Sequence, residues 1–491
     1  METSAIIQAN AALKKTGLGE SYVVMAGVLY MVLPVMLWVA TWFELWLGGA
    51  VLVGMLAALW QVLRKVRRHF ASGEKSVPYS QVLGAALFAL VCTLLLGLDG
   101  RVQQAWDFIV RNPLYQDLIS QSWPLCFAER GCVIYPLQFW LVPAGVSALL
   151  PSWCSTCVLQ LWVFCGMCLL ALNVLAYWGN RRAWVLLVGV LVVAPLTRVV
   201  DIVGMFGLYP SGVFMVNMGV PSALTQWFDT YHFFIITCLY LSLVQGRRLP
   251  LGVLLFISAL LAVMHPMMAA MLFLPVCARV WQDGALRGLR GVVQSLATVE
   301  SVVAFALVVL AAVYYLSGSC GQWCLVFDAP LGRGLNASSI LLCLGSMALL
   351  ILPLWGAWAC SKRKILLLLM AYVPVLILVW VGYENGISEW RYKFVVLYTY
   401  VLIFCLLQSV GRSAAGRLLL VCLFAVSVVS VAAELHRKKV HQAVPTGFPV
   451  RQEYIMDDYS SLSETEGLLR KQFFAPSFAV PAVFRDASST R

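Results

Sequence analysis

The chain has 491 residues, of which 62% are hydrophobic and 11% are charged, and its formal net charge is +12. This composition is typical of a polytopic membrane protein and excludes a soluble enzyme with a single anchor. The positive charge lies mostly in short loops between apolar runs. It therefore predicts membrane orientation and contact with the lipid bilayer, not nucleic-acid binding.

Apolar runs of membrane-spanning length recur from Tyr22 to Val431 and predict an all-α fold with about 13 transmembrane helices. The predicted spans are 22–43, 47–63, 81–98, 156–178, 184–207, 231–245, 250–264, 267–281, 294–316, 338–360, 365–382, 394–410 and 418–433. Basic clusters follow alternate spans, so the positive-inside rule places them and the N-terminus in the cytoplasm. The C-terminus is then expected outside. A re-entrant pair near His265, or the basic run 436–439, would place it inside instead.

The pattern divides the chain into three parts. Residues 1–63 form an N-terminal tail and a transmembrane hairpin, residues 64–434 form the membrane core, and residues 435–491 form a short soluble tail. A tail of this length is too small for a robust core of its own. The core carries three longer segments that the charge rule places outside, and these are 99–153, 208–231 and 317–337.

The first outer segment predicts interfacial structure. Residues 102–110 read as an amphipathic helix, and a second helix is expected at Tyr115–Gln121, ending before Trp123-Pro124. Residues 134–150 are apolar but interrupted by two prolines. They predict an interfacial or re-entrant segment instead of a full span.

Six of the fifteen cysteines form close pairs in segments that are predicted to lie outside. The pairs are Cys126 with Cys132, Cys154 with Cys157, and Cys320 with Cys324. Short-range disulfides in an oxidising compartment are the preferred interpretation. The Cys-x-x-Cys pair is alternatively a redox or metal motif, although no thioredoxin-like pattern or histidine accompanies it.

Carboxylates are the first candidates for chemistry. Asp99 falls at the outer end of a span, and Asp107 and Asp117 follow on the predicted interfacial helices. A carboxylate at the boundary between water and lipid can act as a general base or contact substrate. The alternative for Asp99 is a helix cap, since Asp is a favoured N-cap residue.

This loop resembles the first outer loop of the GT-C superfamily, which are polytopic glycosyltransferases that use polyprenyl-phosphate-linked sugars. The matching residues are Asp99-Gly100, Trp106-Asp107, Trp123-Pro124 and Tyr135-Pro136-Leu137. The resemblance implies that Asp99 is the catalytic base or positions the acceptor, and that the hairpin 22–63 is an N-terminal addition. The loop contains no adjacent acidic pair, so the need for a divalent metal stays open.

Polar residues at other span ends are candidates for substrate binding. His232 and His265 lie at predicted outer ends, where each either binds a phosphate or is satisfied by a backbone carbonyl, and Asp229 is placed to orient His232. Arg391 and Lys393 suit a lipid-linked phosphate, or else belong to an aromatic belt with snorkelling cations.

Three charged residues within apolar spans are further candidates. Arg198 and Asp201 lie three residues apart on one helical face, where they either neutralise each other or support a substrate cavity. Glu300 is expected to pair with Arg290 near the cytoplasmic end of its span.

The sequence therefore predicts a membrane glycosyltransferase that moves a sugar from a polyprenyl-phosphate donor to a glycan, lipid or protein acceptor at the outer face. The resemblance further implies a bacterial inner membrane, with the active face periplasmic or extracellular. Two alternatives remain open. The first is a transporter or flippase of a lipid-linked substrate, with Arg198, Asp201, Glu300 and His265 as its polar path. The second is a non-catalytic partner in an envelope polysaccharide assembly complex.

Overall fold

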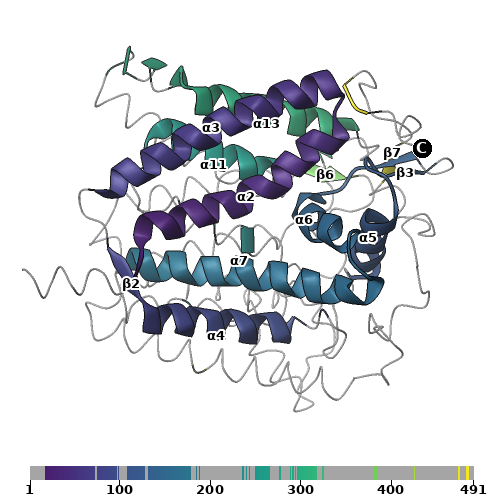
Figure 1. The fold of residues 1–491 in the computed structure, drawn as a ribbon. Helices are drawn as coiled ribbons and strands as arrows, with labels where there is room; N and C mark the ends of the chain where they lie inside the picture. The colour runs from purple at the N-terminus through teal and green to yellow at the C-terminus, as the bar shows by residue number, and fades with distance from the viewer. Residues whose placement is uncertain are drawn as a thin grey trace, which may run out of the picture.

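The fold is a bundle of apolar helices with short strand pairs at its ends (Figure 1). The computed structural model describes mainly the N-terminal third of the chain and a few later segments. The described residues are 17–71, 75–96, 98, 108–127, 131–178, 249–265, 296–317, 323–325, 381–383, 474–475 and 483–485, with isolated residues between 184 and 294 and at 425.

Within this described part, four helices are long and apolar enough to cross a membrane. They are α2 (Glu20–Trp42), α3 (Leu45–Ala71), α7 (Ser155–Trp178) and α13 (Val299–Ser317). The 23 residues of α2 extend about 35 Å at a rise of about 1.5 Å per residue, which exceeds the roughly 30 Å of a bilayer's hydrocarbon core. Two shorter apolar helices accompany them, α4 (Tyr79–Leu95) and α11 (Leu251–Met264).

These six helices coincide with six of the predicted spans. The largest difference is in α3, which continues through the basic cluster to Ala71, well past the predicted end of the span at residue 63. Arg and Lys are good helix formers, so the helix has no reason to stop where the apolar run stops. The other seven predicted spans lie mostly outside the described residues, so the total of thirteen stays a prediction. The predicted span 365–382 ends inside a described strand, β6 (Val381–Tyr383), and not in a helix.

Helix α2 is the centre of the described bundle. It contacts α3, α6 (Gln138–Ser147), α7 and α11, and its core side chains include the fully buried Met31, Trp38 and Val39. Helix α3 lies on the outside of this group. Only 22% of the residues in its most apolar 18-residue stretch are buried, and Trp60 on its surface is 67% exposed. An apolar helix with its side chains turned outward has the arrangement that lipid contact requires.

Short strands lie at both ends of the bundle, which the all-helical prediction missed. At one end β1 (Gly17–Gly19) pairs antiparallel with β2 (Ser76–Pro78). A Cβ atom on Gly17 would lie 2.5 Å from the carbonyl oxygen of Val77, so this close pairing requires glycine there. At the other end β3 (Cys126–Phe127), β4 (Gly131–Val133) and β7 (Phe474–Ala475) form a small antiparallel sheet.

A third strand pair joins β5 (Trp323–Leu325) antiparallel to β6 (Val381–Tyr383). The two chain segments that it connects are far apart in sequence. Strands of two or three residues carry almost no periodic signal, because two alternations cannot be distinguished from chance. The described part of the chain is therefore mostly helical, and its short strands form one local hairpin, β3 with β4, and otherwise join distant segments.

The helix ends separate into two groups. We call the end that carries β1, β2 and the cluster Arg64–Arg68 the basic end, and the end that carries β3 and β4 the disulfide end (Figure 1). Helices α2, α4, α11 and α13 begin at the basic end, whereas α3 and α7 begin at the disulfide end. The basic cluster and the first cysteine pair thus lie at opposite ends of the helices, as the charge pattern predicts for this part of the chain.

Candidate functional site at the disulfide end

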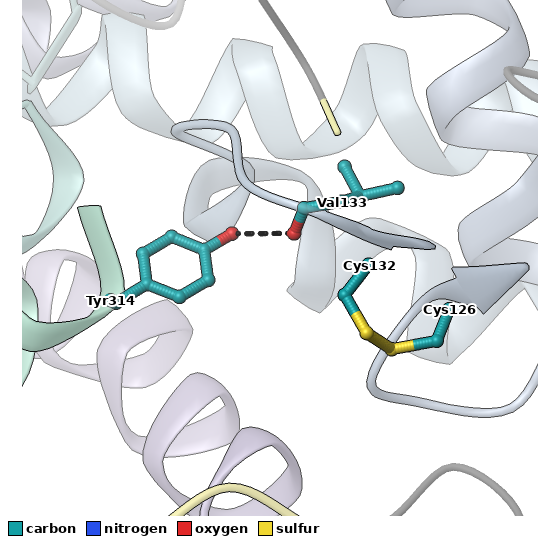
Figure 2. The surroundings of a disulfide bond; sticks show 4 residues. All are labelled: Cys126, Cys132, Val133 and Tyr314. Atoms are coloured by element: carbon teal, nitrogen blue, oxygen red, sulfur yellow. Dashed lines mark hydrogen bonds between the residues drawn. A yellow bond between two sulfur atoms is a disulfide. The ribbon is translucent and has the colours of Figure 1, made fainter. Parts of the chain in front are cut away.

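The disulfide end is organised around a two-stranded hairpin between α5 and α6. Cys126 in β3 lies opposite Cys132 in β4, and a disulfide joins them (Figure 2). Gly131 opens β4 with a φ of +89°, a backbone conformation that a residue with a Cβ rarely adopts. The disulfide is the first of the three predicted pairs, and it fixes this loop at the end of the membrane helices.

The hydroxyl of Tyr314, near the end of α13, ties that helix to the hairpin (Figure 2). The Tyr135 backbone N–H donates to the Tyr314 oxygen at 3.1 Å. The Tyr314 hydroxyl in turn lies 3.2 Å from the carbonyl oxygen of Val133 and 3.1 Å from that of Tyr135. The ring is fully buried. One side chain therefore satisfies the backbone of a segment that is 181 residues away in sequence.

Tyr115 performs a similar role for α5 (Phe108–Ser120). Its hydroxyl is 3.0 Å from the Ser147 hydroxyl at the end of α6, and it donates to the Ser155 carbonyl at the start of α7 at 3.0 Å. Burial raises the pKa of Tyr115 to about 12, and the hydrogen bond with Ser147 partly offsets this. The phenol therefore stays protonated and holds three helices together.

Two charged side chains of α5 point into the protein. Arg111 is 1% exposed and Asp117 is 2% exposed, and both interact with neighbouring groups. Burial of an ionised group is costly unless other groups compensate the charge. The predicted candidate Asp117 is thus a buried carboxylate on α5. Arg111 was missed, because a single Arg in a polar outer loop does not differ from a solvated one.

His265 lies at the same end, immediately after α11. Its backbone N–H donates to the Leu261 carbonyl at 2.7 Å, and its side chain is 3% exposed. Tyr315 donates to the carbonyl of Val263 at 2.8 Å, and its hydroxyl lies 3.5 Å from the side-chain oxygen of the buried Gln138. Tyr315 therefore connects the end of α11, where His265 is located, to the start of α6.

Arg111 and Asp117 on α5, Gln138 at the start of α6 and His265 at the end of α11 are all buried polar side chains. Such groups are expensive near a bilayer and often mark substrate sites. Of the catalytic and substrate-binding candidates selected from sequence, Asp117 and His265 lie among the described residues. The others lie outside the described residues, and these are Asp99, Asp107, His232, Arg391, Lys393, Arg198, Asp201 and Asp229.

The second predicted disulfide is not formed. Cys154 and Cys157 are both free thiols, and Cys157 is exposed. Cys154 ends the short helix η1 (Ser152–Cys154), and α7 begins at the next residue. Helical residues three apart have Cβ atoms about 5–6 Å apart, whereas a disulfide needs about 3.5–4.5 Å. In the third pair, Cys324 lies in β5 and Cys320 lies outside the described residues.

Glu300 has a different partner from the expected one. Its carboxylate lies 2.5 Å from the ammonium nitrogen of Lys65 in α3, and the predicted partner Arg290 is exposed. Lys65 was overlooked because it belongs to another helix, and sequence proximity favoured Arg290. This pair lies at the basic end, away from the candidate site.

Among the described residues, no three His, Cys, Asp or Glu side chains gather in a way that would hold a metal ion. The chain matches no protein-family model, no curated protein and no solved structure.

Proposed function

We propose that the chain is a membrane glycosyltransferase that takes a sugar from a polyprenyl-phosphate donor and passes it to an acceptor at the disulfide end. The observation that supports this best is the loop between α4 and α7. It forms two half-length helices, α5 and α6, and carries two buried side chains of opposite charge, Arg111 and Asp117. A folded loop with internal charges, set against the ends of apolar helices, suits a substrate with a charged head and an apolar tail.

In this proposal the residues have distinct tasks. Asp99 deprotonates or orients the acceptor hydroxyl, as the resemblance to GT-C enzymes implies. Arg391 and Lys393 stabilise the negative charge that develops on the departing phosphate. Asp117 and His265 contribute to substrate binding from the end where their side chains are buried. Asp107 and His232 are assigned to the same task, and Arg198, Asp201 and Asp229 support these groups.

The orientation of the helices in the membrane determines on which face of the membrane the proposed reaction occurs. If the basic end faces the cytoplasm, as the positive-inside rule requires, the disulfide end faces the periplasm or the exterior. A disulfide at that end agrees with an oxidising compartment. We therefore propose a bacterial inner membrane with the active face outward.

The test compares Asp99→Ala, Asp99→Asn and the unchanged protein in purified membranes. Radiolabelled undecaprenyl-phosphate-linked glucose and mannose serve as donors, and transfer to endogenous glycan or lipid acceptors is measured. Loss of transfer in both variants at normal abundance supports a carboxylate in acid–base chemistry or positioning. Activity of the Asn variant equal to that of the unchanged protein would show that Asp99 is only a helix cap.

Asp117→Asn is a second variant with a separate readout. We expect weaker retention of undecaprenyl phosphate, measured as a smaller ligand-induced rise in melting temperature in detergent. The alternative of a transporter relies in part on Glu300, and the ion pair with Lys65 already gives that carboxylate a structural partner. A transporter would instead move labelled lipid across proteoliposomes without transferring the sugar.

A further inference from the structure

The C-terminal segment contacts the disulfide end at two separate places. The first is the small sheet, in which β7 pairs antiparallel with β4. Phe474 lies opposite Val133, and Ala475 lies opposite Cys132. A two-stranded hairpin presents an unpaired edge to which another extended segment can add. Here the distant tail of the same chain occupies that edge, next to the disulfide.

The second contact is the turn between α2 and α3. Phe484 forms an antiparallel bridge with Phe43. The Glu44 N–H donates to the Val483 carbonyl at 2.9 Å, and the Arg485 N–H donates to the Trp42 carbonyl at 3.0 Å. The tail is therefore held by backbone hydrogen bonds on both sides of one aromatic residue.

The side chain of Phe484 is inserted among aromatic rings. It is 2% exposed, and its ring stacks on that of Phe43 with centroids 5.0 Å apart. The ring of Tyr314 is 6.4 Å away, and that tyrosine is the one whose hydroxyl binds the hairpin backbone. Burial of a Phe side chain contributes about 1.5–3 kcal/mol. This anchor is therefore strong enough to define the position of the tail.

We propose that the two described C-terminal segments, residues 474–475 and residues 483–485, act together as a strap that closes the disulfide end within a single copy of the chain. The strap joins the edge of β4 to the turn between α2 and α3, and it covers the aromatic cluster of Phe43, Trp38 and Tyr314. The surface accepts an extended strand at the edge of β4 and, ten positions later in the chain, the buried ring of Phe484. The chain's own C-terminus is the occupant.

A consequence concerns the two ends of the chain. The β1 strand lies at the basic end, and the strap lies at the disulfide end. If the helices cross a membrane, residues 17–19 and residues 474–475 lie on opposite faces, so the chain between them crosses the membrane an odd number of times. This inference does not depend on the proposed enzymatic activity.

The test is a cross-link between Glu44→Cys and Val483→Cys, which leaves both phenylalanines in place. These positions are opposite each other in the bridge, and opposed antiparallel residues have Cα atoms about 4.5–5.5 Å apart, within the range of a disulfide. A protease site inserted in the tail near residue 446 separates the strap from the bundle. After cleavage, the two fragments should stay linked on a non-reducing gel and separate on reduction.

Two controls make the result specific. The pair Trp60→Cys with Val483→Cys uses an exposed position on the outer surface of α3, and it should not cross-link. Co-expression of two differently tagged copies shows whether the surface is occupied by the tail of the same copy or by the tail of another copy. Linkage within one copy supports the strap, whereas linkage between copies, or none at all, overturns it.

Topology gives an independent readout. With tags at both termini, protease added to sealed spheroplasts should remove the C-terminal tag and spare the N-terminal one. Equal protection of both tags would overturn the inference that residues 17–19 and residues 474–475 lie on opposite faces. Phe484→Ala should make the tail several-fold more sensitive to protease while the chain remains in the membrane, and unchanged sensitivity would contradict the anchoring role of Phe484.

Discussion

Lys65 and Glu300 form an ion pair between the end of α3 and the start of α13, with the ammonium nitrogen 2.5 Å from a carboxylate oxygen. Glu300 is 1% exposed, whereas the side chain of Lys65 is 32% exposed. The pair therefore satisfies a carboxylate that would otherwise be buried without compensation, and it joins two apolar helices at the basic end. A Cβ atom on Gly252 would lie 3.6 Å from the other carboxylate oxygen, so α11 approaches the same place.

Removal of the cation should destabilise the bundle. Lys65→Ala leaves Glu300 buried without its partner. Breaking a fully buried pair costs about 3–5 kcal/mol, and we expect about 1–3 kcal/mol here because Lys65 is partly exposed and its charge is screened by solvent. The measurement is the melting temperature in detergent. Arg68→Ala, at an exposed position on the same helix, is the matched control and should change little. An equal effect of both substitutions would contradict a specific role for the pair.

Removal of the Tyr314 hydroxyl alone, with the ring kept, should lower the stability of the protein. Tyr314→Phe removes the acceptor for the Tyr135 N–H and the donor to the Val133 and Tyr135 carbonyls. Buried backbone groups that lose a partner cost about 1–3 kcal/mol. We expect a lower melting temperature and faster proteolysis of the loop between α5 and α6. Tyr22→Phe, at a residue that is 56% exposed, is the control. A Tyr314→Phe variant as stable as the unchanged protein would show that water replaces the hydroxyl.

The sequence predicts well those elements that depend on local hydrophobicity. The bounds of α2 and α7 agree with the predicted spans to within two residues, because an apolar run of this length has few other stable conformations. Helix α5 ends at Ser120, just before the predicted break at Trp123-Pro124, but it begins at Phe108 and not at the predicted Tyr115, so it runs through the predicted gap between two helices. Helix α6 covers only ten residues of the segment 134–150, in agreement with a segment that does not cross the membrane fully.

The contacts between distant segments could not be predicted in the same way. The pairing of β7 with β4 and the hydrogen bonds of Tyr314 depend on where the helices bring their ends, and no periodicity encodes that. The candidate site shows the same limit. Asp117 was selected as a carboxylate on a predicted interfacial helix and His265 as a polar residue at a span end. The burial of Arg111 depends on how α5 packs, which the sequence does not show.

The pKa of Tyr115 leads to a prediction about alkaline pH. The folded protein holds this pKa at about 12, against 10.0 for an unperturbed tyrosine. Between these values the unfolded chain loses the proton while the folded protein keeps it, so the free energy of unfolding falls as pH rises through this window. Below the lower value the contribution is complete. Tyr115→Phe should show a flatter loss of melting temperature above about pH 10, because its ring has no proton to lose.

The control for this experiment is Tyr22→Phe, which should keep the alkaline loss of the unchanged protein. The Tyr115→Phe variant also loses hydrogen bonds to Ser147 and Ser155, so its melting temperature should be lower at neutral pH. The slope with pH and the value at neutral pH are therefore separate readouts. Parallel curves for Tyr115→Phe and the unchanged protein would contradict the raised pKa.

The pair Cys126 and Cys132 and the pair Cys154 and Cys157 should differ in their reaction with thiol reagents and in their contribution to stability. Cys126 and Cys132 are joined, whereas Cys154 and Cys157 are free and Cys157 is exposed. A maleimide polymer should label Cys157 in the unreduced protein and leave the first pair unlabelled until a reductant is added. Replacing Cys126 and Cys132 by Ser should lower stability by about 2 kcal/mol, the loop entropy for a closed loop of about seven residues.

The matched variant replaces Cys154 and Cys157 by Ser and should leave the melting temperature unchanged, because the helical backbone through these positions already holds them apart. If this pair resists labelling before reduction, and if its removal costs as much stability as removal of the first pair, then the start of α7 is not helical through Cys154. That result would support the disulfide between Cys154 and Cys157 that the sequence predicts. Labelling of Cys157 alone at full yield would instead support the free thiols.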